Sequence, residues 1–192
     1  MLDDEHLAIV IGDASGKGIP AAIVALITQT MIKQILKYNN DPSRVLYSLN
    51  NYLCENNSTN MFITLWLGIY NIKTNELVYS NAGHNPPLIK ENDKFKYLNM
   101  DSGLVLGIME DFDFVKDTIV LSDEIVAYTD GITDANNSEN EMYGEDRLLK
   151  FFNEHENYSN QIQSLLKDIK RFTKDAKQYD DMTLLYLKVK DD

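Results

Sequence analysis

The chain has 192 residues, of which 44% are hydrophobic and 25% are charged, so it can form a packed core with an ordinary charged surface. Its formal net charge of -12 argues against nucleic acid or an anionic membrane as a partner, because both would repel it. The lone cysteine, Cys54, excludes an intrachain disulfide, and no apolar stretch approaches the roughly 18 residues of a membrane span, so we expect a cytoplasmic protein.

The first part of the chain predicts a strand followed by two helices. A continuous apolar run ends in a glycine-rich turn, and the next stretch is rich in Ala, Ile and Leu, with Pro20 in its first turn, where proline is tolerated. Asp41 offers a cap for a second helix, which the polar string at residues 55–60 ends. The expected strand, turn and two helices lie at residues 7–11, 12–18, 19–37 and 43–54.

β-structure is predicted for most of the remaining chain. A strand over residues 61–72, a turn at 71–75 and a return strand at 76–81 form a hairpin, and a loop follows at 82–87. Further strands are expected at residues 88–90, 95–98, 114–121, 124–128 and 182–189, and two helices at 145–154 and 160–174. This order indicates one α+β domain over residues 1–192, without an internal boundary.

Acidic residues lie where three of these strands begin or end. Asp13 ends the first strand, Asp130 follows residues 124–128, and Asp180 and Asp181 precede the last strand. Clustered carboxylates need a counter-charge, because two unit charges about 4 Å apart repel by about 4 kcal/mol at an effective dielectric of about 20. Oxygen ligands favour Mg²⁺ or Mn²⁺ over zinc or copper. Each aspartate alone also fits an ordinary turn or strand end.

Six motifs follow one another along the chain. The first reads GDASGKGIPAA, the second NAGHNPP, and the fourth YTDGITDA. In their order and spacing they resemble the metal-dependent serine/threonine protein phosphatases of the protein phosphatase 2C-like fold. The more similar branch is the bacterial one of sporulation stage II protein E and the phosphatases that regulate sigma factors. The motifs lie at residues 12–22, 81–87, 102–107, 128–135, 143–144 and 180–183, so the resemblance covers essentially the whole chain.

The resemblance implies an antiparallel β-sandwich flanked by helices, with a two-metal site for Mn²⁺ or Mg²⁺. Asp13 would bridge both metals, and the carbonyl oxygen of Ala14 would reach the second. Asp130 and Asp180 would hold the first, with Asp181 a weaker candidate. A water between the metals would attack phosphorus directly, without a protein nucleophile. The implied substrate is phosphoserine or phosphothreonine on a regulatory protein such as an anti-sigma antagonist.

Three polar residues of these motifs invite a catalytic interpretation. Ser15 occupies the place of a histidine proposed as general acid in eukaryotic relatives, so the proton donor to the leaving group stays unassigned. His84 lies in a loop shaped by two prolines, and we expect a structural role for it. Lys17 could meet a phosphate, but a solvated turn lysine fits better.

The resemblance also implies features at the amino end and in the two helices. The family carries a Gly-Gly-Asp type segment just upstream, whose acidic residue binds the second metal. We therefore expect an amino-terminally truncated domain, with an exposed sheet edge, a weak second metal and low activity. The helices at 19–37 and 43–54 have apolar faces that fit core packing. They also resemble a switch that completes the metal site and can join two subunits as a homodimer, and a sensor domain could precede the domain in the full-length protein.

Two other functions compete with this interpretation. A phosphate-binding loop of a nucleotide-binding protein requires four residues between its two glycines and Ser or Thr after the lysine. Here three residues separate Gly12 from Gly16, and Gly18 follows Lys17, so this function is disfavoured. A non-catalytic interaction module with the same fold is the stronger competitor, and an assay of turnover separates it from an enzyme.

Overall fold

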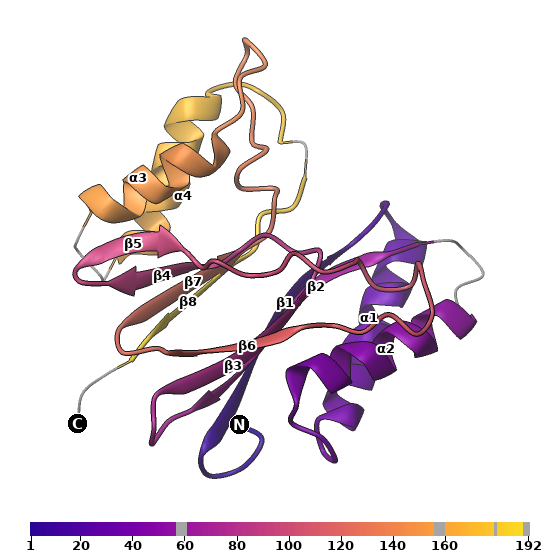
Figure 1. Cartoon of the computed structure of the whole chain (residues 1–192). Helices are drawn as coiled ribbons and strands as arrows, with labels where there is room; N and C mark the ends of the chain where they lie inside the picture. Colours follow the sequence, from indigo (N-terminus) through magenta and orange to yellow (C-terminus); the bar gives the residue numbers. More distant parts are fainter. Residues whose placement is uncertain (57–60, 156–159, 179, 190–192) are drawn as a thin grey trace. The chain divides into compact units, whose positions relative to one another are not determined.

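The computed structural model describes residues 1–56, 61–155, 160–178 and 180–189. Its contacts divide the chain into two compact units, each of which is described by itself (Figure 1). The first comprises Met1–His84 and Asn99–Leu121, and the second comprises Asn85–Leu98 and Ser122–Asp192. The single domain over residues 1–192 stays a prediction.

The first unit contains a four-stranded antiparallel sheet and two helices. The strand order is β1-β2-β3-β6, and within the described residues β1 pairs only with β2, so β1 is an edge strand. The elements are β1 (His6–Ala14), α1 (Ile19–Ile35), α2 (Pro42–Asn56), β2 (Ile63–Asn71), β3 (Glu76–Ala82) and β6 (Lys116–Val120).

The core of the first unit lies between its sheet and its helices. Alternate residues of β2, including Leu65 and Leu67, point to one face, because side chains of a strand alternate between its two faces. They belong to one buried cluster with Leu46 and Leu49 of α2. Each such leucine is fully buried and contributes about 2 kcal/mol through removal of its surface from water. The apolar face predicted for α2 therefore packs in the core.

The second unit has its own four-stranded antiparallel sheet, with the order β5-β4-β7-β8. Every residue of β7 is buried. The core cluster of the second unit also includes Phe151 of α3 and Ile169 of α4. The β4–β5 turn places Asn92 and Asp93 at positive φ, which these two residue types tolerate better than most other non-glycine residues. The elements are β4 (Leu88–Glu91), β5 (Lys94–Tyr97), β7 (Glu124–Tyr128), α3 (Gly144–Glu154), α4 (Gln161–Thr173) and β8 (Leu184–Lys188).

The predicted α+β class, with antiparallel sheets and helices in the expected chain order, is confirmed. The first strand is longer than the predicted apolar run at residues 7–11, because β1 continues to Ala14 by pairing Asp13 with Thr64 and Ala14 with Ile63. Part of the predicted polar break, residues 57–60, lies outside the described residues. Among the residues described here, no helix has the length and apolar character needed to cross a bilayer.

Candidate metal centre

Two of the predicted metal ligands lie close together in the second unit. Asp130 follows β7 and Asp180 precedes β8, and these strands pair antiparallel, with Tyr128 opposite Leu184. Because the end of one strand meets the start of the other, a carboxylate oxygen of Asp130 lies within 4.8 Å of one of Asp180. Both side chains are exposed. The arrangement offers two oxygen ligands, from residues far apart in the sequence, to one ion.

The turn after β7 holds Asp130 in place. The carbonyl oxygen of Asp130 accepts hydrogen bonds from the main-chain N–H of Asp134 at 2.7 Å and from the hydroxyl of Thr133 at 3.1 Å. In the segment before β8, the carbonyl oxygen of Asp180 accepts the side-chain amide of Gln178 at 2.8 Å, and Oδ1 of Asp180 accepts the main-chain N–H of Asp181 at 2.8 Å. Both candidate ligands are therefore attached to backbone that is itself hydrogen-bonded.

A third carboxylate, that of Asp134, lies in the field of these two. Partial burial raises the pKa of Asp134, and the negative charges of Asp130 and Asp180 raise it further. Burial is the larger cause, and the part of the shift that comes from Asp130 and Asp180 reflects negative charge that a divalent cation would offset. Sequence reasoning missed Asp134, although it stands in the same motif as Asp130.

Thr129 was also missed as a residue of this region. It is 4% exposed, directly precedes Asp130, and hydrogen-bonds to the segment that carries Asp180. On the other side of Asp130, Gly131 approaches the same segment so closely that an added Cβ would lie 2.2 Å from the carbonyl oxygen of Asp181. The neighbours of Asp130 thus both contact the residue next to Asp180.

Asp13 belongs to the first unit. It lies on β1 directly opposite Thr64 of β2, and its side chain is exposed. Ala14 is the last residue of β1. Ser15 continues the pairing, because its hydroxyl and its main-chain N–H both bond to the main chain of Phe62, each at 2.8 Å. Ser15 thus has a structural task at the place where a general acid stands in eukaryotic relatives.

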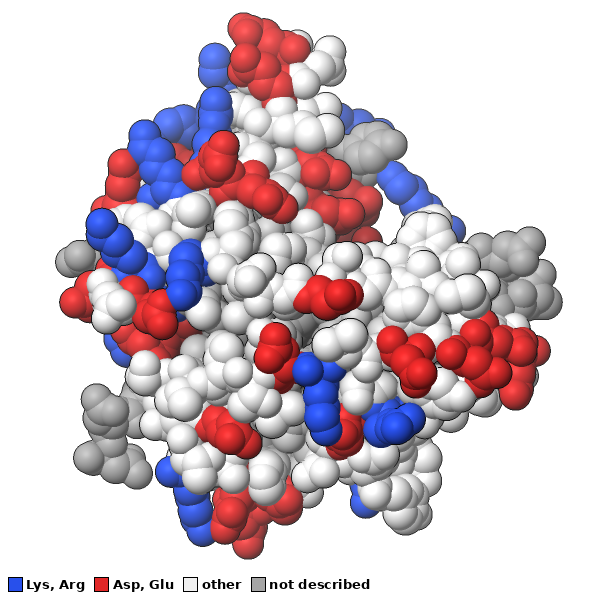
Figure 2. All heavy atoms as spheres, viewed as in Figure 1, with Lys and Arg blue, Asp and Glu red and all other residues white. Residues whose placement is uncertain are grey.

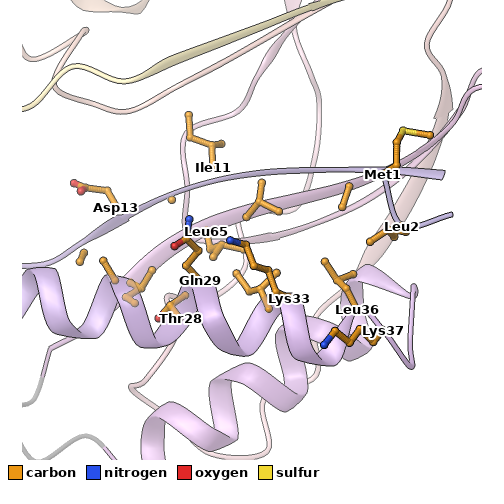
Figure 3. Close-up of a pocket in the computed structure, with 17 residues that line it drawn as sticks. Met1, Leu2, Ile11, Asp13, Thr28, Gln29, Lys33, Leu36, Lys37 and Leu65 are labelled. Atoms are coloured by element: carbon orange, nitrogen blue, oxygen red, sulfur yellow. The ribbon is translucent and has the colours of Figure 1, made fainter.

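A groove of about 620 Å³ runs between β1 and α1 in the first unit (Figure 3). Asp13 lies at one end of this groove, and Met1 and Leu2 lie at the other. Its lining is mainly apolar, but the buried hydroxyl of Thr28 lines it and has no hydrogen-bond partner within the described part of the chain. The groove also contacts Lys33, so it combines an apolar floor with a basic group.

His84 is buried in a hydrogen-bonded loop of the first unit. Its Nδ1 lies 2.9 Å from the hydroxyl of Thr64, the residue opposite Asp13. Its main-chain N–H and carbonyl both bond to the side chain of Asn81. These contacts agree with the structural role predicted for His84.

The charged surface fits the acidic composition. On the face shown in Figure 2, acidic side chains are spread among basic ones. With a formal net charge of -12, the chain lacks the excess of positive charge that nucleic-acid binding uses. The acidic surface is therefore compatible with attraction of cations.

Sequence comparisons point to one family. The family described as Stage II sporulation protein E (SpoIIE) matches residues 3–190. The chain is 32% identical over 197 residues to phosphoserine phosphatase RsbU of Bacillus subtilis (strain 168), a match that covers 98% of the chain and 57% of RsbU. It is 26% identical over 216 residues to Protein IcfG of Synechocystis sp. (strain ATCC 27184 / PCC 6803 / Kazusa), covering 96% of the chain and 34% of IcfG. The chain thus spans only part of the length of these relatives.

Known structures agree at the level of the fold. The SiaA-PP2C domain of Pseudomonas aeruginosa aligns with a TM-score of 0.84 at 16% identity, over 97% of this chain and 77% of that one. The structure of the PP2C phosphatase domain and a fragment of the regulatory domain of SpoIIE from Bacillus subtilis aligns with a TM-score of 0.81 at 21% identity, over 97% and 55%. The fold is therefore PP2C-like, as the sequence motifs predicted.

Proposed function

The chain belongs to the Stage II sporulation protein E (SpoIIE) family, and on that premise we propose that it hydrolyses phosphoserine or phosphothreonine in a protein with the help of Mn²⁺ or Mg²⁺. The observation that carries this proposal is the pair of exposed carboxylates of Asp130 and Asp180, which lie within 4.8 Å of each other. Two relatives, RsbU and RsbP, are named phosphoserine phosphatases.

The donor atoms at the pair fit a hard divalent cation. They are carboxylate oxygens, which Mg²⁺ and Mn²⁺ prefer, and their negative charges add to the effect of burial in raising the pKa of Asp134. When bound, such a cation supplies a water of lowered pKa for attack on phosphorus and stabilises charge on the phosphoryl oxygens. Asp130 and Asp180 would bind it and fix its position.

We further propose that Asp13 and the carbonyl oxygen of Ala14 complete a two-metal site. Asp13 lies at the end of an edge strand and is exposed, so its carboxylate is available as a ligand. The family assignment over residues 3–190 supports the same role, because it includes the first motif as well as the last two.

The proposed substrate is a phosphorylated regulatory protein such as an anti-sigma antagonist. The proposal follows from the sporulation and sigma-factor setting of the family, and the groove beside Asp13 offers an apolar surface with Lys33 for a phosphorylated segment. As partners we propose a second copy of this chain, joined through α1 and α2, and a sensor domain in the full-length protein. The exposed Ile19, Ile23 and Leu26 on α1 support the proposed contact between copies.

A metal titration tests the proposed site. Calorimetry with Mn²⁺ compares the wild-type chain with Asp13→Asn, Asp130→Asn and Asp180→Asn. Each substitution is expected to lower Mn²⁺ affinity about tenfold or more, because even the loss of a group that only orients a metal ligand costs about 10- to 100-fold. Asp93→Asn, in the β4–β5 turn, is the matched control and should bind as the wild type does. Equal affinity of Asp130→Asn and wild type would refute the site.

Turnover is measured in parallel on a phosphoserine peptide with Mn²⁺. A phosphatase is supported if the wild type and Asp93→Asn release phosphate and Asp130→Asn does not. Binding of Mn²⁺ by the wild type without any phosphate release supports instead the non-catalytic interaction module with the same fold.

A further inference from the structure

We propose that Thr129 is a positioning residue, whose hydroxyl fixes residues 180–183 against the turn after β7 and so sets the separation of Asp130 and Asp180. The inference rests on the proposed metal-binding function of these two aspartates. Thr129 itself is 4% exposed and makes no contact with the metal in this proposal.

The hydroxyl of Thr129 makes two hydrogen bonds to the opposite segment. Its Oγ1 accepts the main-chain N–H of Thr183 at 3.0 Å and donates to the carbonyl oxygen of Asp181 at 3.3 Å. The main-chain N–H of Thr129 donates to the carbonyl oxygen of Thr183 at 3.0 Å. One residue therefore bonds three times to the stretch that leads from Asp180 into β8.

The bond from the Thr183 N–H to the Thr129 hydroxyl replaces a main-chain hydrogen bond that would otherwise join the two strands. In an antiparallel pair of strands, every second pair of facing residues exchanges two main-chain hydrogen bonds. Thr129 and Thr183 exchange only one, because the carbonyl oxygen of Thr129 accepts instead from the N–H of Ile132 at 3.1 Å. The hydroxyl takes the place of that carbonyl for Thr183. The chain can thus turn away from the sheet at Thr129, which places Asp130 in the turn, and still keep the two strands joined.

The second bond acts next to the other proposed ligand. Asp181 directly follows Asp180, so a shift of the Asp181 carbonyl moves the Asp180 backbone. This carbonyl is held by Thr129 and is also crowded by Gly131, where an added Cβ would lie 2.2 Å from it. The residues on both sides of Asp130 therefore fix the residue beside Asp180. A small buried side chain with both a donor and an acceptor is needed for this, and serine or threonine meets that need.

The test separates the hydroxyl from the volume of the side chain. Thr129→Val keeps the shape and removes both hydrogen bonds, and Thr129→Ser keeps the hydroxyl. Thr30→Val is the control, since the hydroxyl of Thr30 donates to the Leu26 carbonyl on the exposed side of α1. Mn²⁺ affinity is measured by calorimetry, and exchange of the Thr183 amide hydrogen is measured by NMR without metal.

We expect Thr129→Val to weaken Mn²⁺ binding about 10- to 100-fold, in the range known for residues that orient metal ligands. The Thr183 amide should exchange about fivefold faster or more, because its hydrogen-bond acceptor is gone. Thr129→Ser and Thr30→Val should match the wild type within about threefold in both measurements. If Thr129→Val does not fold, Thr129→Ala is measured in its place.

Two results would overturn the inference. One is wild-type Mn²⁺ affinity in Thr129→Val, and the other is a Thr129→Ser variant whose Mn²⁺ binding is weakened as much as that of Thr129→Val. If the wild type itself binds no Mn²⁺, the proposed metal site fails. The Thr183 exchange then still decides whether the Thr129 hydroxyl holds the segment.

Discussion

Asn81 and His84 hydrogen-bond to each other in both directions. The main-chain N–H of His84 donates to Oδ1 of Asn81 at 3.1 Å, and Nδ2 of Asn81 donates to the carbonyl oxygen of His84 at 3.0 Å. The same Nδ2 donates to the carbonyl oxygen of Ser102 at 2.9 Å. Both Asn81 and His84 are buried, so this amide joins two loops of the first unit away from water.

Replacement of Asn81 by alanine should therefore be strongly destabilising. Asn81→Ala removes three hydrogen bonds in a buried place, among them the acceptor of the His84 main-chain N–H, which costs about 3 kcal/mol of unfolding free energy. Asn153→Ala is the control, because Asn153 also makes three hydrogen bonds, to Phe95 and Leu149, but is exposed. Its loss should be about 1 kcal/mol, since water replaces the lost partners. Urea unfolding measures both, and equal losses would contradict the explanation by burial.

Gly103 lies next to Ser102, whose carbonyl oxygen is bonded to Asn81, and packs closely against the main chain of Asn81. It has a φ of 63°, and an added Cβ would lie 2.1 Å from the main-chain oxygen of Asn81. Gly103→Ala should cost about 3 kcal/mol, because positive φ strain adds to a clash with backbone that cannot move freely. Gly144→Ala separates the two causes, since Gly144 has a φ of 78° but nothing within 4 Å of an added Cβ. It should lose only about 1 kcal/mol. Thermal or urea unfolding measures the stability of both variants. If Gly103→Ala loses no more stability than Gly144→Ala, the steric clash does not contribute.

Local sequence signals predicted the elements well. The capping position of Asp41 is an example, because its Oδ1 accepts the main-chain N–H groups of Ser43 at 3.0 Å and Arg44 at 3.4 Å. The hairpin at residues 61–81 is another, with Trp66 opposite Asn81 and Tyr70 opposite Leu77. Such features depend on neighbouring residues, which a sequence shows directly.

Long-range pairing was harder to predict. The sequence gives no local reason for β3 to pair with β6, or for β4 to pair with β7. Nor does a local signal predict that Leu106, in the motif at residues 102–107, exchanges main-chain hydrogen bonds with Ile63. The proximity of Asp130 and Asp180 could be predicted, because each lies at the end of a predicted strand. The contacts of Thr129 and Asp134 could not, because they depend on how side chains are placed in three dimensions.

Asp41 should make stability depend on pH in the acid range. Partial burial alone would raise its pKa, but hydrogen bonds from Lys116 and Ser43 outweigh burial and hold the pKa below its ordinary 3.8. The folded state therefore releases the proton more readily than the unfolded state, so the stabilisation is present above pH 3.8 and is lost as the pH falls through the folded pKa.

The variants Asp41→Ala and Asp41→Asn separate the cap from the charge. At pH 7, Asp41→Ala should lose about 1 kcal/mol, because the helix loses its cap. Asp41→Asn keeps a capping oxygen and should lose less. The deficit of Asp41→Asn relative to wild type should shrink as the pH is lowered below 3.8, as measured by urea unfolding at several pH values. A deficit independent of pH would show that the charge contributes nothing.

The exposed apolar face of α1, made of Ile19, Ile23, Leu26 and Ile27, provides a test of self-association. These residues recur at helical spacing, and Ile19 and Leu26 are 76% and 63% exposed. The double variant Ile23→Glu with Leu26→Glu should weaken self-association about tenfold or more, because a contact between copies would bury the added charges. Its unfolding free energy should stay within about 0.5 kcal/mol of the wild type, since Ile23 and Leu26 are exposed and do not belong to the core.

The matched control is Ile162→Glu with Leu166→Glu, an exposed apolar pair on α4 of similar exposure. Sedimentation equilibrium over a range of concentrations measures all three proteins. Self-association weakened by the α1 variant but not by the α4 variant supports a contact through α1. Two outcomes would contradict a contact between copies through α1. One is a wild type that stays monomeric at every concentration, and the other is equal weakening of self-association by both variants.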